Sequence, residues 1–137
     1  MLGLNIIWVF NPSRDKVLMC KRHKDPYKGL YNLVGGKIEE GENGLAAAYR
    51  ELQEETGISE GDIKLAHLMD FTYHVGNFWG ERCCVEVYVG SLERVLPVKG
   101  DEKELVWLPV SENFFDSNRF AGEGNIGHVY EIILKHC

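Results

Sequence analysis

The chain has 137 residues, which matches one globular domain with a single core and leaves no room for a second. Hydrophobic residues make up 45% and charged residues 26% of the sequence, and no apolar stretch is long enough to cross a bilayer. The formal net charge of −6 argues against long nucleic acids as ligands but allows a small phosphorylated ligand, if metal ions supply positive charge.

Apolar runs and turn-forming residues predict the secondary structure. In chain order we expect strands at residues 4–10, 16–21 and 31–34, a helix at 43–56, strands at 64–75, 83–92 and 105–110, and a helix at 126–136. Gly35-Gly36 is expected to stop the third strand. The last helix has an apolar face made of Ile126, Val129, Tyr130, Ile133 and Leu134. This order predicts an α/β fold with a mixed sheet between helices.

The cysteines and histidines do not follow a metal-ligand spacing. We expect four reduced thiols and a cytoplasmic protein, because the N-terminus has no secretory signal; the cysteines are Cys20, Cys83, Cys84 and Cys137. The histidines are expected to be structural or surface residues; they are His23, His67, His74, His128 and His136.

The first predicted helix carries a cluster of carboxylates. At 100° per residue, Glu51, Glu54 and Glu55 fall within an arc of about 100°. The neighbouring arc is apolar and can pack on a sheet; it consists of Leu45, Ala48, Tyr49 and Leu52. Like charges at this spacing weaken a helix, whereas Mg²⁺ favours several oxygen ligands. The cluster is either a solvated acidic face or a metal site.

The residues around this cluster have a defined spacing. They are Gly36, five residues, Glu42, seven residues, Arg50-Glu51-Leu52, one residue, Glu54-Glu55, one residue, and Gly57-Ile58. The pattern resembles the Nudix box at all nine of its defined positions. Such a match is expected by chance on the order of once in a billion starting positions, so it favours the metal site.

Each part of the box has a physical reason. Gly35-Gly36 lets the backbone bend and approach a ligand that a Cβ would obstruct. Arg50 lies at the edge of the acidic arc, where it can hold a carboxylate in place. Gly57 can end the helix in a conformation that other residues resist.

The Nudix resemblance implies an α/β/α sandwich in which a loop–helix–loop segment holds Mg²⁺ or Mn²⁺, and water attacks a phosphorus atom of the substrate. It implies that Glu51, Glu54, Glu55 and the Gly35 carbonyl are metal ligands, with Glu42 as an outer ligand. Glu51 is the preferred general base, and the catalytic set is Arg50, Glu51 and Glu54.

Residues 16–22, 31–42 and 101–109 also resemble the MutT-like subfamily, which acts on oxidised nucleoside triphosphates. The resemblance implies a further metal contact from Glu102, with Glu104 as the alternative. The implied base contacts are Asn32, Asn125 and a stacking Phe120, and Gly36 is a further expected substrate contact. Lys21, Arg22 and Lys37 are either phosphate contacts or basic surface residues. Asn32 could equally be a strand-end cap. Glu123 does not reproduce the paired aspartates of one MutT-like branch, which leaves 8-oxopurine specificity open.

The sequence thus predicts a single domain over residues 1–137 with pyrophosphohydrolase activity on a nucleoside triphosphate. ADP-ribose or dinucleoside polyphosphates are alternative substrates. A nucleotide-sensing Nudix module without activity is an alternative of another class, and so is an isomerase of the same fold. The expected partner is a small nucleotide, without long nucleic acid or membrane, and the expected state is a monomer or a homodimer.

Overall fold

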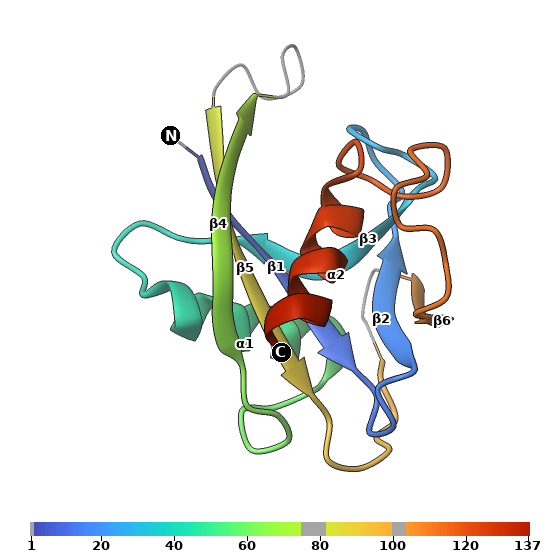
Figure 1. Ribbon diagram of the computed structural model, residues 1–137. Helices are drawn as coiled ribbons and strands as arrows, with labels where there is room; N and C mark the ends of the chain where they lie inside the picture. Colours follow the sequence, from blue (N-terminus) through green and yellow to red (C-terminus); the bar gives the residue numbers. More distant parts are fainter. Residues whose placement is uncertain (1, 75–81, 100–103) are drawn as a thin grey trace.

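The computed structural model describes residues 2–74, 82–99 and 104–137. Within these ranges, three strands and a helix are followed by three more strands and a second helix (Figure 1). The elements are β1 (Leu2–Phe10), β2 (Lys16–Lys21), β3 (Tyr31–Lys37), α1 (Gly44–Thr56), β4 (Ala66–His74), β5 (Arg82–Ser91), β6 (Glu104–Pro109) and α2 (Asn125–His136). Neither helix is long and apolar enough to cross a membrane.

The strands form one mixed sheet in the order β4-β5-β1-β3-β2-β6. β1 lies at its centre, parallel to β5 and antiparallel to β3. The other pairs, β4–β5, β2–β3 and β2–β6, are antiparallel. The expected mixed sheet is therefore confirmed.

One helix packs on each face of the sheet. Side chains alternate along β1, so neighbouring residues of this strand contribute to opposite cores. Trp8 and Phe10 belong to the core that includes Val129 and Ile133 of α2. Ile7 and Val9 belong to the opposite core, which includes Ala48 and Leu52 of α1. In Figure 1, α2 (red) lies in front of the sheet and α1 (teal to green) lies on its other side. The predicted α/β/α sandwich is confirmed.

The third strand differs from its prediction. Gly35 and Gly36 do not stop β3, which continues to Lys37. The reason is long-range pairing: Gly35, Gly36 and Lys37 lie opposite Ile6, Asn5 and Leu4 of β1. β1 itself begins at Leu2, two residues earlier than expected, and β4 begins at Ala66. Residue 75, the expected end of β4, lies outside the described residues.

Two apolar helix positions were predicted wrongly. Leu45 is 40% exposed, because α1 packs through Ala47, Ala48, Leu52 and Thr56. Leu134 is 65% exposed, because the buried stripe of α2 consists of Ile126, Gly127, Val129 and Ile133. None of the four cysteines, all in the described part of the chain, belongs to a disulfide.

Candidate active site

Local signals at both ends hold α1 in place. The Asn43 side chain accepts hydrogen bonds from the backbone N–H groups of Leu45 (3.0 Å) and Ala46 (3.2 Å). Gly57 follows the helix with φ 81°, and its N–H donates to the Gln53 carbonyl. The carboxylates of α1 are therefore carried on a helix with both ends capped.

Arg50 joins the carboxylates of the helix to the preceding loop. Its Nε and Nη2 donate to the two carboxylate oxygens of Glu42, at 2.7 and 2.9 Å. Its Nη1 donates to Glu51 (3.0 Å) and Glu54 (3.3 Å), and Nη2 also reaches the Lys37 carbonyl (3.1 Å). Arg50 thus contacts three carboxylates, and its bidentate partner is Glu42.

The surroundings shift the pKa values of Glu42 and Glu51 in opposite directions. The Arg50 guanidinium holds the pKa of Glu42 at about 2, so this carboxylate is ionised at neutral pH. Burial raises the pKa of Glu51. The hydrogen bond from Arg50 lowers this pKa in part, and the negative charges of Glu55 and Glu54 raise it further. Glu51 is thus a less solvated carboxylate in a negative environment.

The two glycines of β3 lie directly against the helix carboxylates. A Cβ on Gly36 would come within 2.5 Å of the Glu51 carboxylate, so a side chain there would displace Glu51 from its present position. Gly35 has φ 151°, and a Cβ there would overlap the Asn5 carbonyl. Its N–H donates to Glu55 Oε2 at 3.1 Å. The backbone conformation and the β1 neighbour thus favour glycine at position 35, and the nearby Glu51 carboxylate favours it at position 36.

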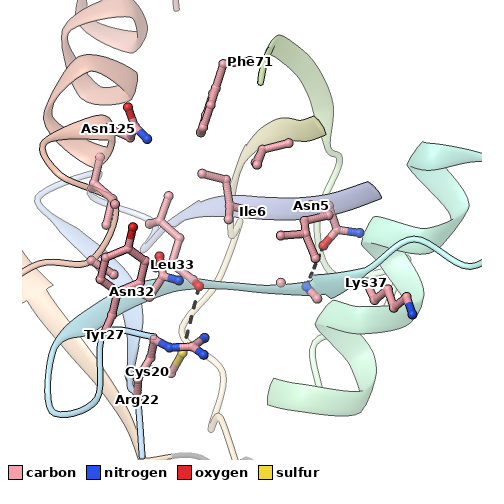
Figure 2. A pocket seen from close by; sticks show the side chains of 17 residues that line it. Asn5, Ile6, Cys20, Arg22, Tyr27, Asn32, Leu33, Lys37, Phe71 and Asn125 are labelled. Atoms are coloured by element: carbon pink, nitrogen blue, oxygen red, sulfur yellow. Dashed lines mark hydrogen bonds between the residues drawn. The ribbon is translucent and has the colours of Figure 1, made fainter. Parts of the chain in front are cut away.

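Asn5 was not predicted from the sequence. It is 1% exposed on β1, and its Oδ1 accepts a hydrogen bond from the Gly36 N–H at 2.9 Å (Figure 2). Its Nδ2 has no hydrogen-bond partner among the described residues. The signal that could have identified it is an amide inside the apolar run of β1, since buried polar groups are normally there for a partner.

A pocket of about 250 Å³ opens beside these glycines (Figure 2). Of the predicted site residues, it is lined by Arg22, Asn32, Gly35, Gly36, Lys37 and Asn125. Residues that the sequence did not indicate also line it, among them Asn5, Tyr27 and Phe71. Asn32 also accepts a hydrogen bond from the Leu33 N–H, so it combines a pocket position with a local backbone contact.

Two predicted substrate contacts, Phe120 and Lys21, do not line this pocket, and neither do the predicted metal-binding and catalytic side chains, which are Glu42, Arg50, Glu51, Glu54 and Glu55. Phe120 is 1% exposed and packs in the core with Phe114, so its ring is not available to stack on a base as the structure stands. Lys21 lies at the end of β2, outside the pocket lining. Glu102 lies outside the described residues, and its alternative, Glu104, is exposed at the start of β6.

The geometry agrees with the sequence motif, and so does the comparison with known families: the NUDIX domain matches residues 2–128. The chain belongs to the Nudix family. An ADP-ribose pyrophosphatase from Methanocaldococcus jannaschii is 46% identical over 44 residues, which are 32% of this Nudix chain and 26% of that relative. The match thus spans about a quarter of the relative's length.

Solved structures share the Nudix fold at low sequence identity. The E. coli dihydroneopterin triphosphate pyrophosphohydrolase has a TM-score of 0.78 at 19% identity, over 97% of this chain and 95% of that one. A C. elegans Ap4A hydrolase has a TM-score of 0.77 at 15% identity, over the whole of both chains. A MutT protein from Methanosarcina mazei has 0.77 at 17%, over 98% and 94%.

His67 is an exposed residue of this Nudix chain, as expected of a surface histidine, and it lies beside two carboxylates. His67 Nε2 lies 2.6 Å from Asp70 Oδ1, and the ligand atoms of His67, Asp70 and Glu86 all lie within 4.8 Å of one another. A bulge in β4 between His67 and Met69 breaks the strict alternation of faces. In the described part of the chain, the carboxylates of the Nudix box do not gather this closely.

Arg50→Gln tests the role of the guanidinium. We expect activity or metal affinity to fall about 10- to 100-fold, the range seen when a group that orients metal ligands is lost. Glu42 and Glu51 would keep their charges and lose their cationic partner. Hydrolysis rates measured against Mg²⁺ concentration check this. Arg94→Gln, which removes an exposed partner of Asp62, is the control and should change neither value. Wild-type behaviour of Arg50→Gln would contradict the assignment.

Proposed function

We propose that this Nudix chain is a MutT-like pyrophosphohydrolase that cleaves the diphosphate linkage of a nucleoside triphosphate, including oxidised forms. One observation carries the proposal: the Gly35–Gly36 backbone lines the pocket and also contacts the carboxylates of α1. A substrate in the pocket would therefore have its phosphates next to Glu51 and Glu55. The volume of about 250 Å³ is below the roughly 300–1,000 Å³ of sites that enclose a whole ligand. This supports a pocket that takes one end of the substrate.

The donor set fits a divalent cation. Carboxylates from Glu42, Glu51, Glu54 and Glu55 lie around the single guanidinium of Arg50 or against Gly35 and Gly36, so negative charge is in excess. Glu51, Glu54, Glu55 and the Gly35 carbonyl would hold Mg²⁺ or Mn²⁺, with Glu42 further out. When bound, such an ion neutralises phosphate charge and lowers the pKa of a bound water.

The side chains of the chain then have separate tasks. Glu51 would accept the proton of the attacking water while the P–O bond to the leaving phosphate breaks. Arg50 orients Glu51 through their 3.0 Å hydrogen bond. Lys37, which lines the pocket next to the box glycines, would contact substrate phosphates, and Arg22 lines the same pocket from the β2–β3 loop. Asn32 and Asn125 would hydrogen-bond the edge of the base.

A second candidate substrate is ADP-ribose. The relative from M. jannaschii, named an ADP-ribose pyrophosphatase, is 46% identical over its 44 matched residues, which favours this candidate. It would place the second phosphate and its ribose outside the pocket. A sensor without activity is less well supported, because the chain keeps Arg50 and the box carboxylates in contact with one another.

A substrate panel tests the function. The purified protein is given dNTPs, an 8-oxopurine dNTP, ADP-ribose and diadenosine tetraphosphate with Mg²⁺, and release of phosphate or pyrophosphate is followed. We expect hydrolysis of a triphosphate that stops with excess chelator, because the box carboxylates need a bound cation to act on an anion. Full activity in chelator would contradict the metal assignment, and preference for ADP-ribose would favour the second candidate. No hydrolysis of any member would overturn the enzymatic function.

A further inference from the structure

Two segments far apart in sequence form the pocket end away from the box glycines. One is the β2–β3 loop at residues 22–30, and the other is the segment at 119–125 before α2; they lie side by side in Figure 1. Their bases are joined through the main chain of Tyr31. Its N–H donates to the Arg119 carbonyl, and its carbonyl accepts from the Ala121 N–H, both at 2.9 Å. The spacing of the two segments is thus fixed where they leave the sheet.

A side-chain hydrogen bond joins the same segments at their tips. Tyr27 Oη donates to Glu123 Oε2 at 2.5 Å, across 96 positions of sequence. The carboxylate carries a charge, which strengthens the bond, and Glu123 is exposed to solvent. We call this pair the Tyr27–Glu123 bridge.

Both residues of the bridge have backbones that non-glycine residues rarely adopt. Tyr27 has φ 68° and Glu123 has φ 51°. Such conformations persist where surrounding contacts hold them, and they often occur at ligand clamps. The Tyr27 loop is braced below its tip, since Arg22 Nε donates to the Pro26 carbonyl at 2.7 Å and Gly29 N–H donates to the Arg22 carbonyl at 2.8 Å. Loss of the bridge would therefore remove the side-chain hydrogen bond between the tips and leave the loop bases in place.

The bridge lies at one end of the pocket. Tyr27 lines the pocket from one segment, and Gly122 and Asn125 line it from the other. Figure 2 places Tyr27, Asn32 and Asn125 toward one end, and Asn5 and Lys37 toward the other. Gly36 lies against the Glu51 carboxylate, and the Lys37 carbonyl accepts a hydrogen bond from Arg50. The bridged end is therefore the one that receives the part of the substrate remote from the reacting phosphates.

We propose that the Tyr27–Glu123 bridge determines substrate specificity by fixing the width of the pocket end that receives the base. The proposal rests on the proposed function. A fixed width favours one size of heterocycle, because a wider end leaves gaps around a small ring and a rigid end excludes a large one. Without this hydrogen bond, the tips of the 22–30 loop and the 119–125 segment are less tightly joined. The pocket then binds the base with lower affinity.

Variants that remove the bridge test this. Tyr27→Phe keeps the ring and loses the hydroxyl, and Glu123→Met keeps the length and loses the acceptor. For the preferred nucleotide we expect each to raise KM about 5-fold, the effect of losing one typical hydrogen bond, and to change kcat less. The double variant should be no worse than either single one, because all three remove the same bond. Glu123→Gln, whose amide oxygen can still accept, should restore much of the affinity.

Two controls separate specificity from stability. A ribose triphosphate without a base should keep its KM in every bridge variant. Tyr49→Phe removes a tyrosine hydroxyl that accepts from the Leu65 N–H, away from the pocket, and should lower the melting temperature without changing KM. Equal KM increases for substrates with and without a base, together with a lower melting temperature, would make the bridge purely structural and overturn the proposal. Unchanged KM values in all bridge variants would also overturn it.

Binding measurements keep this test separate from the enzymatic function. If the wild-type protein hydrolyses nothing in the panel, calorimetry with a non-hydrolysable nucleoside triphosphate and Mg²⁺ replaces KM with Kd. Weaker binding in Tyr27→Phe and Glu123→Met would then support the bridge although the enzymatic function had failed. Equal binding in all variants, or none by the wild-type protein, would overturn the bridge proposal.

Discussion

Glu51→Gln should lower the rate of hydrolysis by about 100- to 10,000-fold, the range that a lost general base produces. At the same time the melting temperature should stay the same or rise slightly. Burial raises the pKa of Glu51, and Glu55 and Glu54 add like charge, so a neutral amide removes an unfavourable charge from the folded state. The hydrogen bond to Arg50 can persist through the amide oxygen.

Steady-state rates with Mg²⁺ and thermal unfolding without it measure the two effects separately. Glu131→Gln is the matched control, because Glu131 is an exposed residue of α2 on the other side of the sheet. It should change neither value. A variant that loses stability and keeps its activity would mean that the carboxylate cluster of α1 is structural.

Phe120→Ala should lower the free energy of unfolding by about 3–5 kcal/mol, as expected for removal of a fully buried aromatic ring. Phe120 is 1% exposed, its ring centroid lies 5.1 Å from that of Phe114, and Tyr31 packs at 6.4 Å. Denaturant unfolding measures the loss. Phe115→Ala is the comparison: Phe115 is 42% exposed and should cost about 1 kcal/mol or less.

The same variant distinguishes the core position from a base-stacking role. If Phe120 stacked on the base, Phe120→Ala would raise KM for every nucleotide by a similar factor and cost little stability. The buried position leads us to expect the opposite balance. A stable Phe120→Ala with uniformly raised KM would show that the segment rearranges when substrate binds.

The box and its helix could be predicted because their signals are local. Asn43 before the helix, Gly57 after it and the spacing of Glu51, Glu54 and Glu55 lie within one stretch, and the structure has α1 where they indicate. The link from Gly36 to Glu51 follows from the same stretch, since the motif defines both positions.

The pocket could be predicted only in part, because its far end depends on contacts between distant segments. Phe120 and Asn125 are close in sequence. The backbone pairing of Phe120 with Tyr31 directs Phe120 into the core, whereas Asn125 lines the pocket. Asn5 and Tyr27 belong to the pocket through sheet register and loop packing. Neither relation has a signal in the local sequence.

The Gly35–Gly36 backbone lies between the carboxylates of α1, which would carry out hydrolysis, and the pocket end that would determine substrate specificity. The Glu51 and Glu55 carboxylates lie against this backbone, so substitution of Gly35 or Gly36 would disturb the groups that carry out hydrolysis. The other end of the pocket is built from two loop segments that carry none of these carboxylates. Mutations in those loops can therefore change substrate specificity while the hydrolytic residues stay the same. Related proteins with different substrates can diverge from this fold in that way.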